Sequence, residues 1–139
     1  MGQLSFEGQL SAGPASQSAG VFPASSVNCP VSLKTNPTSF GACTGVIERS
    51  LSSASSYTTL DGVGAGKTVT RGTFIYFKCD SKLSLRLTYG DEGDYTTTPI
   101  VPVVVVQGLF VMEFASGAEL VLLEAEGSSK LEYWVSGPQ

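Results

Sequence analysis

One stretch of nine residues limits the possible folds more than any other part of the chain. Between Ser81 and Tyr89, apolar and polar side chains alternate without a break. Successive side chains of a β-strand point to opposite faces, so this pattern predicts a strand with one face in a core and the other in solvent. No window shows a sustained 3.6-residue period, and we expect no long helix. One face carries Leu83, Leu85, Leu87 and Tyr89, and the other carries Lys82, Ser84, Arg86 and Thr88.

Short apolar runs separated by turn residues predict further strands along the chain. They recur roughly every 8–12 residues in the second half, which is typical of antiparallel all-β domains. The sequence therefore predicts an all-β protein, an antiparallel β-sandwich or jelly roll. The other predicted strands are Gln3–Leu10, Gly45–Ser52, Thr73–Cys79, Pro99–Val106, Leu109–Phe114, Glu119–Ala125 and Lys130–Ser136. The predicted turns are Gly90–Asp94, Gln107–Gly108 (a short hairpin or a bulge), Ser116–Gly117 and Gly127–Ser129.

The chain changes character near residue 60. Residues 1–60 are rich in serine and proline and contain only four charged side chains, Glu7, Lys34, Glu48 and Arg49. We expect residues 1–60 to form an opening strand and an irregular extended arm, and residues 61–139 to form the β-sandwich core of one continuous domain. Such an arm buries little apolar surface of its own, so it needs a scaffold or a neighbour to lie on.

The composition excludes several partners and chemistries. The 139 residues carry a formal net charge of −4 and include no His. Clustered Lys and Arg are needed to bind nucleic acid, and His is the commonest general base and metal ligand. The longest apolar run, Ile100–Val106, is far shorter than the ~20 residues that span a bilayer, so we expect no membrane partner. Charged residues make up 14% of the chain, against about 25% usually, so a partner is expected to cover part of the surface.

The stretch Asp61–Thr70, DGVGAGKTVT, resembles the end of a phosphate-binding loop. In such a loop a glycine would stand at position 61, and a helix would follow Lys67. Asp61 would repel phosphate, and the residues after Lys67 favour a strand, so the free amides of a helix N-terminus would be missing. We therefore interpret the stretch as a glycine turn between two strands.

No cluster of residues predicts catalysis, a metal or a cofactor. Asp91, Glu92 and Asp94 could supply oxygen ligands to calcium, although a solvated turn is the favoured interpretation. The serines lack both a nucleophile-elbow motif and a His to activate them. Five carboxylates could in principle include a glycosidase pair, but on alternating strands such residues usually face solvent. These five are Glu113, Glu119, Glu124, Glu126 and Glu132.

The three cysteines, Cys29, Cys43 and Cys79, have no zinc-site spacing. We favour three free thiols, with a Cys29–Cys43 disulfide as the alternative.

Several apolar residues are predicted to form an interface. The segment Leu109–Phe114 is apolar on both faces, and only one face can belong to the core of its own chain. Of the adjacent pair Tyr133 and Trp134, one is expected in the core and the other at an interface. The predicted interface residues are Phe6, Phe22, Phe110, Met112, Phe114 and Trp134.

The second half of the chain resembles small accessory virion proteins of tailed bacteriophages. The resemblance covers about residues 67–137 and lies in the stretches TVTRGTFIYFKCDSKLSLRLTYGDEGD and VVVVQGLFVMEFASGAELVLLEAEGSSKLEYWVSG. It implies a β-sandwich that oligomerises, often threefold, on a capsid, or that sits on a tail or fibre. It also implies a virion location, after assembly in the host cytoplasm.

We therefore expect a non-enzymatic virion structural protein, a homotrimeric capsid decoration or cement protein that binds the major capsid protein or another virion protein. The alternative is a glycan-binding or receptor-binding module of a tail or fibre, which would need exposed aromatic side chains beside polar groups. A small hydrolase using carboxylates ranks last. The aromatic candidates for glycan binding are Tyr57, Tyr89, Tyr95 and Trp134.

Overall fold

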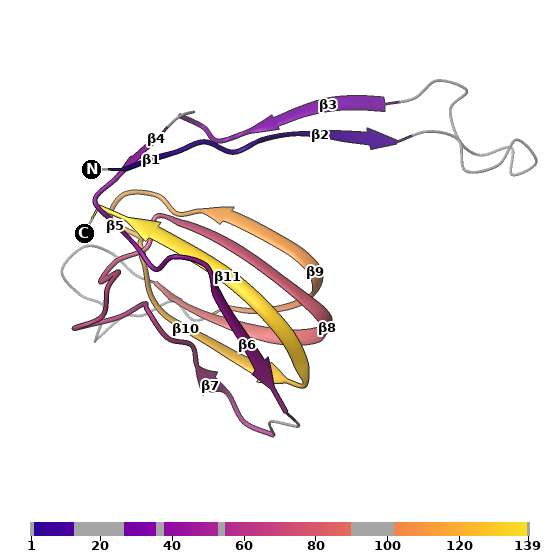
Figure 1. Cartoon of the computed structure of the whole chain (residues 1–139), viewed down its shortest axis with the longest axis vertical. Coiled ribbons are helices and arrows are strands. Elements are labelled where there is room, and N and C mark those ends of the chain that lie inside the picture. Colours follow the sequence, from indigo (N-terminus) through magenta and orange to yellow (C-terminus); the bar gives the residue numbers. More distant parts are fainter. Residues whose placement is uncertain (1, 13–26, 36–37, 53–54, 90–101, 139) are drawn as a thin grey trace, which may run out of the picture. The chain divides into compact units, whose positions relative to one another are not determined.

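The computed structural model describes residues 2–12, 27–35, 38–52, 55–89 and 102–138, and these form strands and turns without a helix. The predicted all-β antiparallel class is confirmed, because every strand pair of the large sheet is antiparallel. The chain divides into two compact units (Figure 1). The smaller unit is Gln3–Ser39, and the larger unit is Phe40–Gln139 with the first two residues.

The smaller unit contains a β-hairpin that the sequence did not predict. Strand β2 (Glu7–Ala12) pairs with β3 (Val27–Ser32) over six residue pairs. The expectation of an irregular arm is wrong for β3, which is a strand although it contains Pro30. In a two-stranded hairpin each strand has a free edge, so a proline can stand where no amide hydrogen bond is needed. A short strand β1 (Gly2–Leu4) pairs with β4 (Thr38–Phe40).

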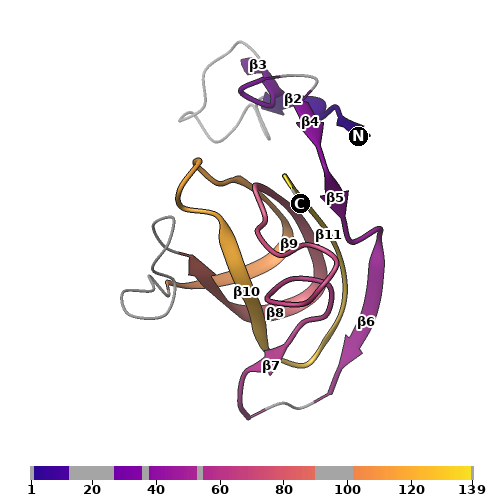
Figure 2. The same cartoon turned by 90° about the vertical axis from the view of Figure 1, so that its left-hand side faces the viewer.

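The larger unit contains one curled sheet of seven strands. The strand order is β5-β11-β8-β10-β7, with β6 also paired to β11 and β9 paired to β8. In Figure 2 the sheet curls so that β10 and β7 lie on one side and β11 and β6 on the other. The strands are β5 (Ala42–Cys43), β6 (Ile47–Leu51), β7 (Thr58–Thr59), β8 (Phe74–Tyr89), β9 (Val103–Glu113), β10 (Leu120–Gly127) and β11 (Ser129–Gly137).

Strand β8 is the centre of this sheet. Its first half pairs with β11 and its second half with β10, so one strand takes part in both sides of the curled sheet. The prediction of separate strands at Thr73–Cys79 and Ser81–Tyr89 is therefore wrong. The polar residues between them remain extended because the hydroxyl of Ser129 accepts hydrogen bonds from the amides of Asp80 and Ser81, at 3.1 and 2.9 Å.

Strand β9 is likewise one strand where two were predicted. It pairs with β8 from Val103 to Glu113, with a register shift opposite the bend in β8. Gly108 has a φ of 91° and lies inside the strand, so Gln107–Gly108 is not a hairpin. The predicted alternative, a bulge, agrees with the register shift between β8 and β9 at this point. Residues 99–101 and the predicted turn Gly90–Asp94 lie outside the described residues.

The core lies inside the curl, and the predicted alternation places it correctly. Leu83, Leu85 and Leu87 are almost completely buried, and Ile75 and Phe77 continue the same inward face along the first half of β8. The inward residues of the other strands complete one hydrophobic cluster. They include Tyr133 and Val135 of β11 and Leu120, Leu123 and Ala125 of β10.

The change of composition near residue 60 does not coincide with the division into units. Strands β5 and β6 pair with β11, and β7 pairs with β10, so residues 42–59 supply three strands of the large sheet. These three strands are short, with two, five and two residues.

Candidate functional site

The stretch Asp61–Thr70 forms a turn, as predicted. The amide of Gly64 donates to the carbonyl of Val69, and the amide of Lys67 donates to the carbonyl of Gly64, both at 3.0 Å. Val63 and Val69 are buried in the core. Strand β8 follows the turn, so the stretch lacks the helix N-terminus whose amides and dipole hold a phosphate.

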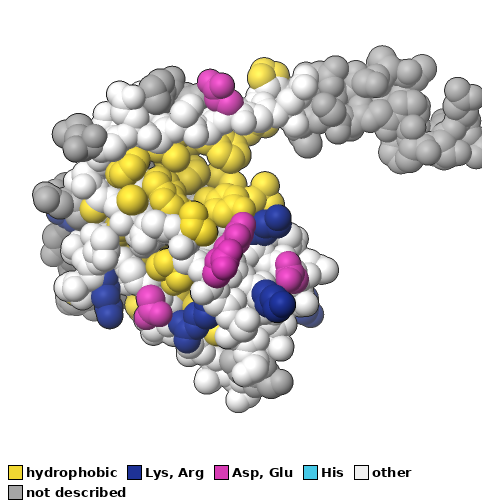
Figure 3. Space-filling model, viewed as in Figure 1, with side chains coloured by type: hydrophobic (Ala, Val, Ile, Leu, Met, Phe, Trp, Pro, Cys, Tyr) yellow, Lys and Arg dark blue, Asp and Glu magenta, His cyan; other side chains and the backbone are white. Residues whose placement is uncertain are grey.

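On the outer face of the sheet, register partners on successive strands form rows of side chains. A row of apolar and aromatic side chains lies beside a row that is mostly charged. Across β11, β8 and β9, one row is Trp134, Tyr76 and Val111. The neighbouring row runs across β6, β11, β8 and β9. Figure 3 shows hydrophobic side chains gathered on this face of the larger unit, with charged side chains beside them. The neighbouring row is Glu48, Glu132, Lys78 and Leu109.

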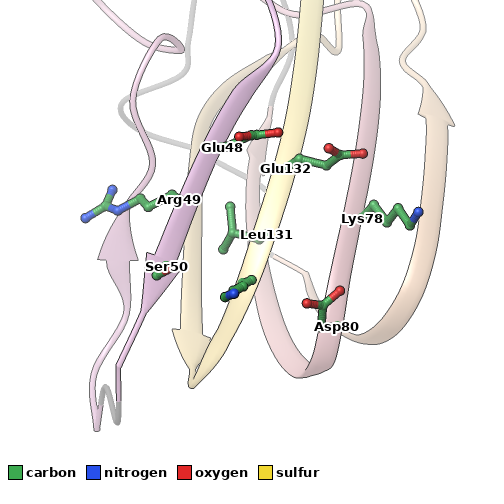
Figure 4. Close-up of a pocket in the computed structure, with 8 residues that line it drawn as sticks. Glu48, Arg49, Ser50, Lys78, Asp80, Leu131 and Glu132 are labelled. Carbon is green, nitrogen blue, oxygen red and sulfur yellow. The ribbon is translucent and has the colours of Figure 1, made fainter.

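A shallow hollow of about 450 Å³ lies on this face over β6, β11 and β8. Figure 4 shows the side chains of Glu48 and Glu132 beside each other and that of Lys78 on the adjacent strand. Arg49 points away from them, and its guanidinium contacts Asp61 at 3.8 Å and the carbonyl of Thr59 at 3.2 Å. The lining residues are Glu48, Arg49, Ser50, Lys78, Asp80, Lys130, Leu131 and Glu132.

Two carboxylates, Glu48 and Glu132, stand directly opposite each other on β6 and β11. Like charges opposite each other in a sheet are unfavourable, so this pair needs compensation. The hydroxyl of Tyr76 donates a hydrogen bond of 2.7 Å to Glu132, and Lys78 is the register partner of Glu132 on the other side. The hydrogen bond to Glu132, with burial and the carboxylate charge, raises the pKa of Tyr76. The hollow can therefore make ion pairs and hydrogen bonds with a partner surface.

The carboxylates proposed for catalysis are not gathered at one place. Glu132 lines the hollow, whereas Glu124 lies in β10 and forms an ion pair of 3.3 Å with Arg86. Glu119 is buried just before β10. Glu113 ends β9, and Glu126 is the register partner of Ser84. They therefore occupy three strands and a loop, and Glu124 and Glu126 are the two that lie on one strand, two residues apart.

Within the described residues, no group of three or more Cys, Asp or Glu side chains lies together in a way that could hold a metal ion. The cation candidates Asp91, Glu92 and Asp94 are outside those residues. Cys43 and Cys79 are free thiols. The side chain of Cys29 is outside the described part.

The aromatic residues proposed for glycan binding each contact different neighbours. The Tyr57 ring lies 3.9 Å from the guanidinium carbon of Arg86. Tyr89 packs on Phe114, with ring centroids 5.9 Å apart. The Trp134 ring contacts Phe40 and Phe74, at centroid distances of 5.5 and 5.9 Å. These three residues therefore form no single stacking platform, and Tyr95 is outside the described residues.

The predicted interface residues have different locations. Trp134 is on the outer face, half-buried. Phe110 and Met112 point inward and pack against the core, and Phe114 is part of the core. The exposed side of β9 carries Leu109 instead, which is 62% exposed. Phe6 lies between β1 and β2 of the smaller unit, and Phe22 is outside the described residues.

Sequence reasoning missed the hollow because its side chains come from three strands that are distant in the sequence. The alternation of β6, IERSL, could have placed Glu48 on an outer face. Only the register of β6 against β11 brings it beside Glu132.

Comparison of the chain with protein-family models, with curated proteins and with solved structures finds no match. Among the described residues, no helix is long and apolar enough to cross a membrane.

Proposed function

We propose that this chain is a non-enzymatic structural protein of a phage virion, which binds capsid subunits as a decoration or cement protein. The observation that carries the proposal is the outer face of the sheet, where exposed apolar side chains adjoin a charged hollow. Val46, Val105 and Leu109 are each more than 60% exposed. Apolar residues clustered beside polar ones favour contact with another protein surface.

The chemistry of the hollow fits a protein partner. Its acidic and basic side chains come from neighbouring strands of a rigid sheet, which suits complementary ion pairs with a second protein surface. Such pairs mainly set specificity and orientation, while the apolar row would supply buried area. The resemblance of residues 67–137 to accessory virion proteins favours a capsid subunit as that partner.

The glycan-binding alternative has weaker support. A sugar-binding platform needs an exposed aromatic face beside hydrogen-bonding groups. The described candidates are already in contact with Arg86, Phe114, Phe40 or Phe74.

The test is co-sedimentation of the full chain with capsids of the phage whose genome encodes it. We expect the wild-type chain to bind and Lys78→Glu to weaken binding at least roughly tenfold, because charge reversal at a protein contact costs affinity. The matched control is Lys67→Glu, which makes the same change at an exposed residue of the glycine turn. Lys67→Glu is expected to bind as wild type does.

Two results would contradict the proposal. One is a folded wild-type chain that does not bind the capsid. The other is equal weakening by both substitutions, which would indicate a general charge effect instead of contact at the hollow. A glycan array with the same preparations tests the alternative directly.

A further inference from the structure

Strand β9 is a long edge strand with one unpaired side. It pairs with β8 over Val103–Glu113, and no described residue pairs with its other edge. The free edge of a strand presents a row of backbone N–H and C=O groups that can pair with another strand. What fits this edge is therefore an extended strand, bound by main-chain hydrogen bonds.

The side chains of β9 indicate that its sheet is incomplete on this side. Val104, Phe110 and Met112 point inward but are only half-buried, and they pack at the border of the core. Their register partners on β8 are Leu85, Phe77 and Ile75, which are 0% exposed. An added strand would cover these half-buried side chains, and removing their apolar surface from water would favour association.

The edge carries little charge that would oppose pairing. Edge strands of monomeric proteins commonly carry lysines, prolines, inward-pointing charges or bulges that prevent association, and of these β9 has only the irregularity near Gly108. The sequence of β9 is VVVVQGLFVME, in which Glu113 at the end is the only charged residue. Val103 and Val105 are 56% and 61% exposed on its outer side.

We propose that the partner of this edge is β9 of a second copy of the chain, paired antiparallel about a twofold axis at Gly108. Gly108 is the midpoint of Val103–Glu113, so this register pairs the whole length of both strands. It places Val105 opposite Val111 and Gln107 opposite Leu109, and each pair lies on the outer face. A Cβ at Gly108 would meet no atom within 4 Å, so no side chain of the same copy covers the face of β9 at the proposed axis.

Charge favours a second copy as the occupant. In the antiparallel register the two Glu113 carboxylates lie at opposite ends, roughly 34 Å apart at 3.4 Å per residue, so they do not repel each other. Each stands opposite Val103 of the other copy, whose register partner on β8 is Arg86. Arg86 is paired with Glu124 within its own copy, so the contact places no like charges directly opposite each other.

The pairing would join two curled sheets through their β9 strands. Because the same strand is used on both copies, the contact is twofold and closes as a dimer. A threefold ring cannot form through this contact alone. The inference goes beyond capsid binding and does not depend on it, since the contact forms without any virion component.

The experiment measures the mass of the full chain by light scattering across micromolar concentrations, with no capsid present. We expect a dimer for wild type and a monomer for Val105→Lys, because pairing would place a lysine against apolar side chains of the other copy. The control, Val46→Lys, makes the same change at a residue that is 66% exposed and lies outside β9. It should remain a dimer. Circular dichroism and thermal melting confirm that both variants fold.

Hydrogen exchange provides the second measurement. Amides of residues 103–113 should exchange at least roughly tenfold faster in Val105→Lys than in wild type, because unpaired edge amides are open to solvent. A wild-type monomer, a trimer, or a dimer that survives Val105→Lys would overturn the proposal. So would concentration-dependent protection confined to residues 3–39, which would indicate association through the smaller unit.

Discussion

Strands β8 and β9 are neighbours with similar apolar composition, yet they have different surroundings. Strand β8 has a partner on both sides along its length, whereas β9 has one described partner. As a result, Phe77 of β8 is 0% exposed, while its register partner Phe110 is half-buried. The comparison shows that position in the sheet, more than hydrophobicity, decides whether an inward side chain is fully buried.

The largest expected loss of stability comes from replacing Phe77, and its register partner Phe110 provides the comparison. Phe77→Ala should lower the free energy of unfolding by about 3–5 kcal/mol, because it leaves a cavity in a fully packed core. Phe110→Ala should cost about 1–2 kcal/mol, because its side chain is partly solvated already. Urea unfolding at low protein concentration measures both. Equal losses of unfolding free energy would contradict the difference between a central and an edge strand. A larger loss for Phe110→Ala at high protein concentration would indicate that a second copy covers the Phe110 side chain.

Two glycines with positive φ show the same contrast between a crowded position and an open one. A Cβ at Gly127, at the corner between β10 and β11, would lie 2.7 Å from Leu83 Cδ2 and 3.2 Å from the carbonyl of Lys82. Gly127→Ala should therefore cost about 2–4 kcal/mol, from backbone strain and overpacking together. Gly108→Ala meets open space and should cost only the strain, about 1–2 kcal/mol. Thermal melting compares them, and a reversed order would show that the edge at Gly108 is already covered in the monomer.

Ser129 tests how the bend of β8 is held. Its hydroxyl accepts hydrogen bonds from two amides of β8 and donates to the carbonyl of Lys130 at 2.8 Å. Ser129→Ala leaves those amides without this acceptor and should cost about 1–3 kcal/mol. The neighbouring exposed Ser128 provides the control, since Ser128→Ala should change stability by less than about 0.5 kcal/mol. Indistinguishable unfolding curves for the two variants would mean that the bend does not need this hydroxyl.

The smallest expected change in stability at neutral pH concerns the phenol of Tyr133, which lies on the core side of β11. Burial, and then the charge of Asp61, raise its pKa from 10.0 to about 12. The neutral phenol is therefore favoured in the folded state, so its contribution to stability is complete below pH 10 and is lost as the pH rises toward 12. Unfolding free energies should fall across this range, and less steeply in Tyr133→Phe. An identical slope in the variant would assign the loss to other groups.

Oligomeric state separates two inferences about the same strand. The resemblance to accessory virion proteins implies a homotrimer, whereas the free edge of β9 favours a twofold dimer. The interface residues predicted from the sequence also include Phe110 and Met112 of β9, so the number of copies, and not the strand, distinguishes the two inferences. Mass measurements on wild type and Val105→Lys therefore decide between them.

The sequence by itself determined which side of the second half of β8 would enter the core. The alternation of Ser81–Tyr89 predicted the buried leucines of β8, and the residues after Lys67 excluded a phosphate loop. These predictions succeed because the direction of a side chain in a strand, and the turn preference of glycine, depend on local backbone geometry. The break predicted at Asp80 failed, because the Ser129 hydroxyl accepts hydrogen bonds from the amides of Asp80 and Ser81 where no described strand pairs with them. At Gln107–Gly108 no hairpin forms, and the register shift agrees with the predicted alternative of a bulge.

Only the tertiary structure decided which strands lie at the centre, which remain at an edge, and which side chains meet across the sheet. Glu48 and Glu132 are opposite each other because β6 pairs with β11 in one register, and nothing local to either residue specifies that pairing. The same holds for β9, whose apolar sequence would suit a central strand equally well. Strand order and register depend on the simultaneous packing of segments distant in the chain, so they emerge only when the whole sheet has formed.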